Sequence, residues 1–134
     1  MLPKDAQIYV ATAPIDMRRS FDGLALAVQE RMQRDPHSGA LYVFVNANRT
    51  RIKILWFEAS GYSLLYKRLD RGVFRVPDPS TAHATGCDID ANELFAILDG
   101  IELPTDRKSA RKIVHQARTQ ALHAREKIQH SRTP

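Results

Sequence analysis

The chain has 134 residues, with 20 Lys and Arg against 15 Asp and Glu and a formal net charge of +5. This length allows one domain with a short appendage, because domains usually run to roughly 100–150 residues. The 43% apolar and 26% charged residues are typical of a globular protein and argue against a chain disordered throughout. The apolar runs are too short for a membrane span or a secretory leader, and the single Cys87 cannot form an internal disulfide. We therefore expect a cytoplasmic protein without membrane contact.

Charge is distributed in blocks along the chain. Residues 49–75 contain seven Lys or Arg and two Asp or Glu, whereas residues 76–106 contain seven acids and no Lys or Arg. Residues 107–134 contain eight basic side chains and one acid. Two basic blocks that flank an acidic one indicate a nucleic acid or an acidic protein as the partner.

The N-terminal third predicts one strand followed by one helix. Residues 7–11 are typical of a short strand, and Thr12-Ala13-Pro14 ends it. Apolar side chains then recur at helical spacing, at Met17, Phe21, Leu24, Val28 and Met32. We expect Asp16 to be the N-cap of this helix and Gly23 to allow the close approach of another backbone.

From residue 40 to residue 76 the pattern changes to that of strands. The predicted strands are residues 41–46, 51–57, 62–69 and 73–76, and the turns between them are short. Ile52, Ile54 and Trp56 share one face of their strand, while Arg51, Lys53, Leu55 and Phe57 share the other. Short turns favour antiparallel neighbours. We therefore predict an α+β fold with an antiparallel meander of about five strands, covered by the amphipathic helix.

The remainder of the chain predicts a second helix and a tail. Residues 77–86 are typical of a linker, and Asp90 with Glu93 three residues later resembles a capping box that opens a short helix, closed by Gly100. The residues after Pro104 have helical spacing, but their apolar stripe is mostly alanine and buries little until something packs against it. We predict one domain, residues 6–103, and a basic helical tail, residues 104–134.

Catalytic signatures are scarce. The six glycines are scattered singly, so there is no phosphate-binding glycine loop. Cys87 four residues after His83 is a weak nucleophile or zinc pattern. Asp88 and Asp90, together with His83, are the best arrangement for a metal-dependent nuclease, but capping explains Asp90 without a metal. We expect no enzymatic activity, no metal and no cofactor.

The basic, aromatic strands are the stronger candidate site. Cations attract phosphates, and exposed aromatic rings stack on unpaired bases at about 1–3 kcal/mol each. The predicted phosphate contacts are Arg18, Arg49, Arg51, Lys53, Lys67, Arg68 and Arg71, and the predicted stacking groups are Trp56 and Tyr66. Most of the aromatic side chains in these strands are expected in the core.

Six motifs in a fixed order resemble a known family. They are Pro14-x-Asp16-Met17-Arg18, Phe21-Asp22-Gly23-Leu24, Asp35-Pro36-x-Ser38-Gly39, Phe44-x-Asn46, Arg51-x-Lys53-x-Leu55-Trp56 and Lys67-Arg68-Leu69-x-x-Gly72-x-Phe74. Together they resemble the small TnpB-type accessory protein of the insertion-sequence 66 transposon group, over residues 6–103. The first hairpin loop is less basic here than the family pattern, and Ser20 stands where glycine is common.

The resemblance implies a bacterial protein that aids transposition while a separate transposase performs the strand-transfer chemistry. It carries no catalytic residue to this chain. We expect a non-enzymatic accessory protein that contacts element DNA through the basic sheet face and the tail. The alternative is an adaptor that binds the transposase or another accessory protein without direct DNA contact, and the sequence leaves the oligomeric state open.

Overall fold

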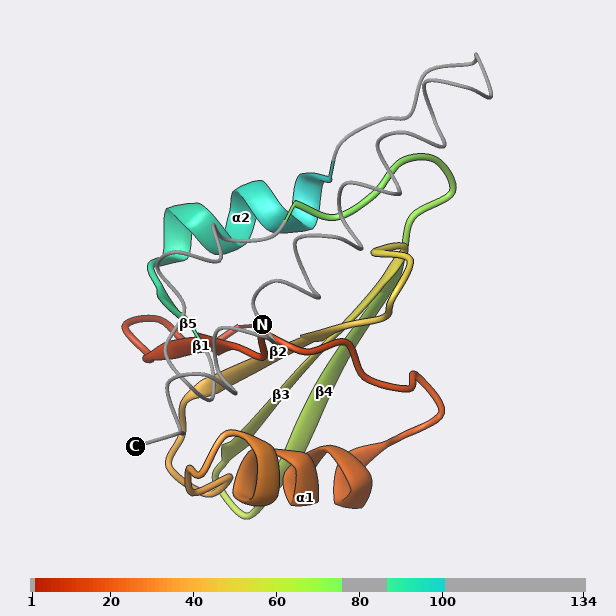
Figure 1. Ribbon diagram of the computed structural model, residues 1–134. Helices are drawn as coiled ribbons and strands as arrows, with labels where there is room; N and C mark the ends of the chain where they lie inside the picture. Colours follow the sequence, from red (N-terminus) through yellow and green to blue (C-terminus); the bar gives the residue numbers. More distant parts are fainter. Residues whose placement is uncertain (1, 76–86, 101–134) are drawn as a thin grey trace, which may run out of the picture.

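The computed structural model describes residues 2–75 and 87–100, which form an α+β fold (Figure 1). The elements in chain order are β1 (Ile8–Val10), α1 (Phe21–Arg31), β2 (Leu41–Val45), β3 (Arg51–Glu58), β4 (Gly61–Arg68), β5 (Cys87–Ile89) and α2 (Ala91–Asp99). Among these described residues, no helix is both long enough and apolar enough to cross a membrane. The predicted tail, residues 104–134, lies outside the described residues.

The five strands form one mixed sheet in the order β4-β3-β2-β1-β5. The three strands β2, β3 and β4 are antiparallel neighbours, as their short turns predict. The expectation of an antiparallel meander throughout is wrong, because β1 pairs with β2 in parallel, with Ile8 opposite Leu41. The connection from Val10 to Leu41 carries α1 and is long enough for the crossover that parallel pairing needs.

The fifth strand is not the predicted one. Within the predicted strand 73–76, the described residues make only an isolated bridge at Val73. Phe74 is buried there, and its backbone N–H donates to the carbonyl of Arg49 at 2.6 Å, so this segment folds back on the β2–β3 loop. The fifth place in the sheet belongs to β5, which pairs antiparallel with β1 and whose residues, directly after the predicted linker 77–86, were predicted to form no element.

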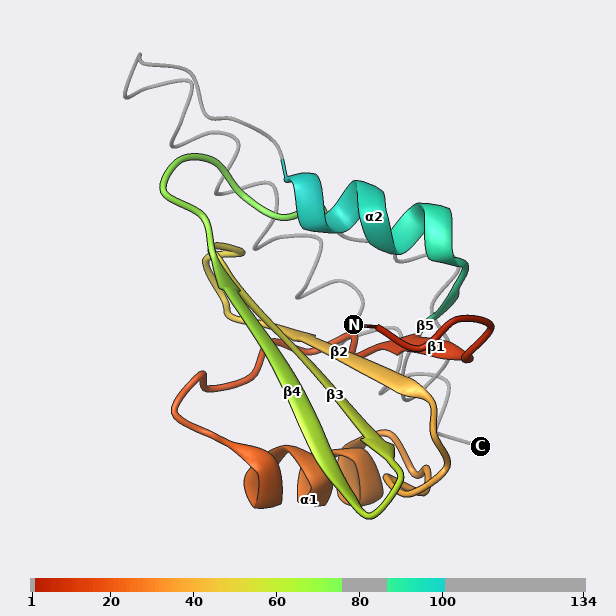
Figure 2. The ribbon, with the colours of Figure 1, turned by 180° about the vertical axis from the view of Figure 1, so that it is seen from behind.

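Each face of the sheet is covered by one helix, as the two opposite views show (Figures 1 and 2). On one face, Leu24 and Val28 of α1 pack with Tyr42, Phe44 and Leu55. On the other face, Leu94 and Ile97 of α2 pack with a cluster from all three central strands that includes Val43, Ile54 and Trp56. Because β2 lies between the two layers, all five of its residues are buried.

The helix α1 begins later than predicted. Its N-cap is Ser20, and the predicted cap, Asp16, instead accepts hydrogen bonds from the backbone and guanidinium of Arg18. The carbonyls of Met17 and Arg19 accept from the Nζ atom of Lys53, at 2.8 and 2.7 Å. Local side-chain hydrogen bonds compete with helix formation, which explains why this apolar-periodic segment stays outside α1.

Gly23 has a different close neighbour from the one expected. A Cβ atom at Gly23 would lie 3.2 Å from the Cβ atom and 3.3 Å from the Cγ atom of Arg19. The crowding therefore comes from a side chain in the preceding turn and not from a second backbone. Glycine is suited to position 23 because the Arg19 side chain occupies the space that a larger side chain at position 23 would need.

The capping box of α2 is confirmed. The carboxylate of Asp90 accepts from the Glu93 backbone N–H at 2.8 Å, and the Glu93 carboxylate accepts from the Asp90 backbone N–H at 3.3 Å. At the other end, Gly100 closes the helix with φ +71° and ψ −177°, a conformation that is essentially restricted to glycine. A Cβ atom there would lie 2.8 Å from Cδ1 of Leu69 and 3.1 Å from the carbonyl oxygen of Val73.

We expect Gly100→Ala to lower the free energy of unfolding by about 2 kcal/mol, since the backbone strain alone costs roughly 1–3 kcal/mol. Urea unfolding, followed by the fluorescence of the single Trp56, measures this loss. Gly61→Ala is the matched control, because a Cβ atom at Gly61 would meet nothing within 4 Å. A Gly100→Ala protein as stable as the Gly61→Ala protein would contradict the strained cap.

Candidate nucleic-acid interface

The pairing of β3 with β4 brings four of the predicted contact residues onto one face. Arg51 lies directly opposite Arg68, and Lys53 directly opposite Tyr66. Paired residues on neighbouring strands point to the same side of a sheet. This is the side that α1 covers, but α1 packs against Leu55 and Leu64, further along the strands. The end of the ladder with Arg51, Tyr66 and Arg68 stays exposed, and we call these three residues the basic ladder.

The basic ladder is partly ordered by its own hydrogen bond. The Arg51 Nη1 atom donates to the Tyr66 hydroxyl oxygen at 2.9 Å. The Tyr66 side chain is 47% exposed, so the ring remains accessible beside the two guanidinium groups. A guanidinium has five N–H donors, and this bond uses one of those on Arg51. The remaining donors can bind an anion such as a phosphate.

No carboxylate neutralises the basic ladder within the described parts of the chain. In residues 2–75 and 87–100, the ion pairs join Arg18 to Asp16 and His37 to Asp35. Like charges directly opposite each other on neighbouring strands are destabilising. The pairing of Arg51 with Arg68 therefore costs stability in the free protein, and a bound anion would relieve that repulsion.

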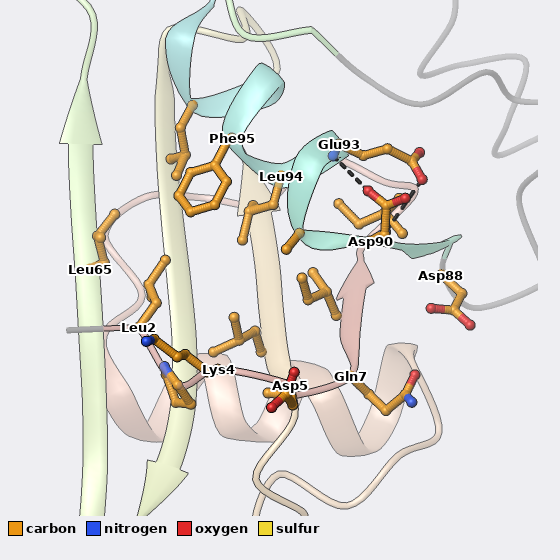
Figure 3. Close-up of a pocket in the computed structure, with 17 residues that line it drawn as sticks. Leu2, Lys4, Asp5, Gln7, Leu65, Asp88, Asp90, Glu93, Leu94 and Phe95 are labelled. Atoms are coloured by element: carbon orange, nitrogen blue, oxygen red, sulfur yellow. Dashed lines mark hydrogen bonds between the residues drawn. The ribbon is translucent and has the colours of Figure 1, made fainter.

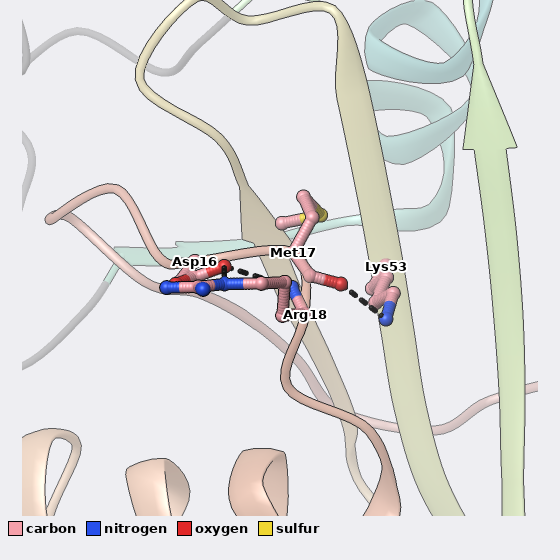
Figure 4. Close-up of polar contacts among 4 residues, drawn as sticks. All are labelled: Asp16, Met17, Arg18 and Lys53. Carbon is pink, nitrogen blue, oxygen red and sulfur yellow. Dashed lines mark hydrogen bonds and ion pairs between the residues drawn. The ribbon is translucent and has the colours of Figure 1, made fainter.

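Lys53 lies below the basic ladder and has a structural role. Its side chain is buried, since the residue is only 5% exposed, and Nζ bonds the carbonyls of Met17 and Arg19 (Figure 4 shows the first of these). The same ammonium lies 4.6 Å from the centroid of the Tyr66 ring, within cation–π distance. Lys53 thus holds the segment before α1 against the sheet by hydrogen bonds and lies against one face of the Tyr66 ring.

Two further predicted contacts are buried. Arg49 is 3% exposed and Trp56 is 7% exposed, and Trp56 belongs to the core cluster under α2, on the face opposite the basic ladder. Neither Nε of Arg49 nor Nε1 of Trp56 has a hydrogen-bond partner among the described residues. Burial lowers the pKa of Arg49 to about 10, which leaves this guanidinium charged at neutral pH. In this conformation neither side chain presents its surface to a nucleic acid.

Lys67 faces α2, whereas Arg71 lies in the loop at the same end of the sheet. Lys67 alternates with Arg68 and faces α2, where its Nζ donates to the carbonyl of Leu98 at 2.8 Å. A cation at this position interacts favourably with the C-terminal end of a helix. Arg71 is exposed in the loop that follows β4, and two backbone hydrogen bonds hold this loop against the β2–β3 loop: Leu69 N–H to Thr50 O, and Phe74 N–H to Arg49 O. Arg71 is therefore kept at the same end as the basic ladder.

Arg18 is exposed but paired. Its side chain is 91% exposed, and Nε and Nη2 donate to Oδ2 of Asp16 at 2.9 and 2.6 Å. The hydrogen bonds from Arg18 lower the pKa of Asp16 to about 2, so the carboxylate stays charged over the whole neutral range. Figure 4 shows the Arg18 guanidinium turned toward Asp16 and away from Lys53. Arg18 is therefore not a member of the basic ladder, although the carbonyls of its neighbours Met17 and Arg19 bond Lys53.

Sequence reasoning left out one exposed cation at this end. Arg75 follows the buried Phe74 and is exposed, next to the loop that carries Arg71. Arg75 belongs to the basic block of residues 49–75, but the sequence pattern predicts a strand there, and Arg75 is not among the predicted phosphate contacts. Within residues 2–75 and 87–100, no three His, Cys, Asp or Glu side chains gather as a metal site, and His83 of the nuclease hypothesis lies outside these ranges.

Comparison with known proteins gives one family match. The model of the family described as "IS66 Orf2 like protein" matches residues 6–108. The chain is 36% identical over 104 residues to the uncharacterized protein y4hO of Sinorhizobium fredii (strain NBRC 101917 / NGR234), covering 76% of this chain and 88% of that protein. It is 35% identical over 71 residues to the uncharacterized protein y4jC of the same strain, covering 53% and 61%. No solved structure matches.

Proposed function

Because this chain belongs to the family of IS66 Orf2-like proteins, we propose that it is a non-enzymatic transposition protein that contacts element DNA through the basic ladder. Family membership supports the accessory role in transposition. The charged side chains at the end of β3 and β4 support the proposed DNA contact. The basic tail, residues 104–134, is not needed for this proposal.

The observation that carries the proposal is the direct opposition of Arg51 and Arg68. An exposed pair of like charges, without an ion-pair partner among the described residues, is a surface that favours an anionic ligand. Arg71 and Arg75 extend this surface in the adjoining loop, and Tyr66 supplies an exposed ring whose hydroxyl bonds Arg51. Guanidinium groups bind phosphates in bidentate fashion, while an exposed tyrosine ring can stack on an unpaired base.

A salt titration of DNA binding tests this proposal. If Arg51, Arg68, Arg71 and Arg75 each neutralise one phosphate, the slope of log K against log salt is roughly −3 to −4, at about −0.9 for each contact. The titration uses duplex DNA from the ends of the element and the full chain, followed by fluorescence anisotropy. The absence of binding at about 50 mM salt, where electrostatic contacts are strong, would overturn the DNA contact.

The adaptor alternative makes a different prediction in a pull-down from cells. An adaptor would retain the transposase after nuclease treatment, whereas a protein that meets the transposase only through DNA would lose it. Purified transposase and the purified chain, mixed without DNA, provide the matched measurement. A stable complex there, combined with a flat salt titration, would replace the proposed function by the adaptor function.

Removal of the Asp16 carboxylate is expected to strengthen DNA binding. Asp16→Asn frees Arg18 from its ion pair, and the carbonyls on either side of Arg18 bond Lys53, which lies next to the basic ladder. One additional phosphate contact would steepen the salt slope by about 0.9 and raise the affinity several-fold at about 0.1 M salt. Asp22→Asn is the control, because it changes the net charge equally and Asp22 has no ion pair within the described residues. Equal gains from both variants would show a general effect of net charge.

A further inference from the structure

A groove with an apolar lining lies on the α2 side of the sheet, on the opposite face from the basic ladder. Its volume is 1130 Å³, and it runs between α2, the N-terminal segment before β1 and the edge of β4. Figure 3 shows the Phe95 ring, Leu94 and Leu65 turned toward the same space above Leu2. Phe95 is 60% exposed, the largest exposure among the bulky apolar side chains of the described residues. An apolar groove with an aromatic side chain at its edge is typical of a docking site for an amphipathic segment.

The rim of the groove is acidic. Among the described residues, Asp5, Asp88, Asp90 and Glu93 line it, against one basic side chain, Lys4. The Asp90 and Glu93 carboxylates already accept backbone N–H groups in the capping box, but both residues remain exposed. Each carboxylate has further acceptor positions beside the one used in the capping box. The groove therefore favours a segment that is both amphipathic and basic.

The chain contains such a segment immediately beyond α2. Residues 107–134 contain eight Lys or Arg and one Glu. Apolar residues at helical spacing form a single stripe, at Ala110, Ile113, Val114, Ala117, Ala121, Ala124 and Ile128. Alanine in that stripe would let a helix backbone approach an aromatic side chain such as Phe95 closely. The segment thus has the charge and the apolar pattern that the groove requires.

We propose that this groove binds the chain's own C-terminal segment, residues 107–128, as a helix whose apolar stripe covers Phe95 and Leu65. The short covalent connection between α2 and this segment favours it over a second copy of the chain or a partner protein. Leu98 lines the groove, α2 ends at Asp99 with Gly100 as its cap, and only residues 101–106 separate this cap from the segment. Six residues can span up to roughly 20–22 Å, more than the 10–12 Å diameter of a helix, so the chain can turn back over α2.

Tethering also favours the chain's own segment over a second copy. A short linker gives an effective concentration on the order of 1 mM, about a thousandfold above a protein solution at about 1 µM. A contact too weak to form between separate molecules is therefore formed within one molecule. The basic segment then lies over the acidic rim, and the basic ladder on the other face is left as the free cationic surface. This inference does not depend on the DNA contact.

Paramagnetic broadening in the full chain tests the inference. A nitroxide label is placed beside the stripe, so that it does not block the contact, by Gln120→Cys in a Cys87→Ser background, and methyl NMR signals are compared before and after reduction of the label. We expect the methyl signals of Leu2, Leu65 and Leu94 to lose at least half their intensity. The methyl signals of Leu26, on the exposed side of α1, should keep theirs. Unchanged signals at the groove would overturn the inference and leave the groove open for a partner protein.

Two further measurements distinguish the occupants and control for folding. In a mixture of isotope-labelled chains without nitroxide and unlabelled chains with nitroxide, broadening as strong as in the single-chain sample would show a second copy in the groove and overturn the inference. Ile113→Asp with Val114→Asp should restore the groove signals at least twofold. Phe95→Ser should do the same, whereas Leu26→Ser, which removes a similarly exposed side chain from α1, should not.

Discussion

Arg68→Glu should weaken DNA binding by about fifty- to a hundredfold at about 0.1 M salt, without loss of stability. The substitution removes one guanidinium and places a carboxylate directly opposite the other, Arg51. Two phosphate contacts are lost together, which makes the salt slope shallower by about 1.8. In the free protein an opposite-charge pair replaces a like-charge pair across the strands, and such a change is worth roughly 0.2–1 kcal/mol in favour of folding. Stability and binding are thus expected to move in opposite directions.

Anisotropy titrations and urea unfolding of the same preparations measure both quantities. Arg31→Glu is the matched control, because Arg31 is exposed in the last turn of α1 and the change in net charge is the same. This control should bind DNA within about threefold of the wild type and keep its salt slope. If both variants lost the same affinity, binding would follow the net charge of the protein and not the basic ladder.

The antiparallel part of the fold could be predicted from local signals. Connections as short as the five residues 46–50 and the two residues 59–60 leave antiparallel pairing as the available geometry, and β2, β3 and β4 follow it. The alternation in β3 also assigned its residues to the correct faces, with Ile52, Ile54 and Trp56 on one side. The capping box of α2 needed only Asp90 and Glu93 at the right spacing.

The long-range features could not be predicted in the same way. The parallel pairing of β1 with β2 depends on where the chain goes after a thirty-residue connection, and the residues of β1 carry no signal for strand direction. The strand β5 has three residues, with the exposed Asp88 in its centre, so its pattern is too short to separate from a linker. This segment becomes a strand because it pairs with the free edge of β1.

In the candidate site, too, local features could be predicted from the sequence and long-range features could not. Strand alternation could place Arg51 and Lys53 on one face, and register then brings Arg68 and Tyr66 beside them. Alternation could not reveal which of these cations another segment covers. The segment of Met17 and Arg19 lies over Lys53 and leaves Arg51 exposed, and this difference arises from the path of the chain between β1 and α1.

Lys53→Met is expected to lower the free energy of unfolding by about 3 kcal/mol. The Lys53 ammonium donates to two carbonyls at 2.8 and 2.7 Å, and hydrogen bonds to a charged group contribute roughly 1.5–3 kcal/mol each. Methionine fills a similar volume and avoids the cost of burying a charge, so the net loss is smaller than the sum of the two bonds. Urea unfolding, monitored by the fluorescence of Trp56, measures this loss in the free energy of unfolding.

The comparison with Lys67→Met tests whether burial is the cause. Lys67 is exposed, and its Nζ atom donates to the carbonyl of Leu98, so its replacement should cost less than about 1 kcal/mol. Equal losses from the two variants would contradict the anchoring role of Lys53.

DNA binding by Lys53→Met separates an anchor from a phosphate contact. Under conditions where the variant is fully folded, an anchor that does not touch DNA leaves the salt slope unchanged. A direct phosphate contact would instead make the slope shallower by about 0.9. Because Lys53 is 5% exposed and its ammonium is already bonded to Met17 and Arg19, we expect the unchanged slope. The basic ladder would then bind DNA with Arg51 and Arg68, on a platform whose shape depends on the lysine beneath it.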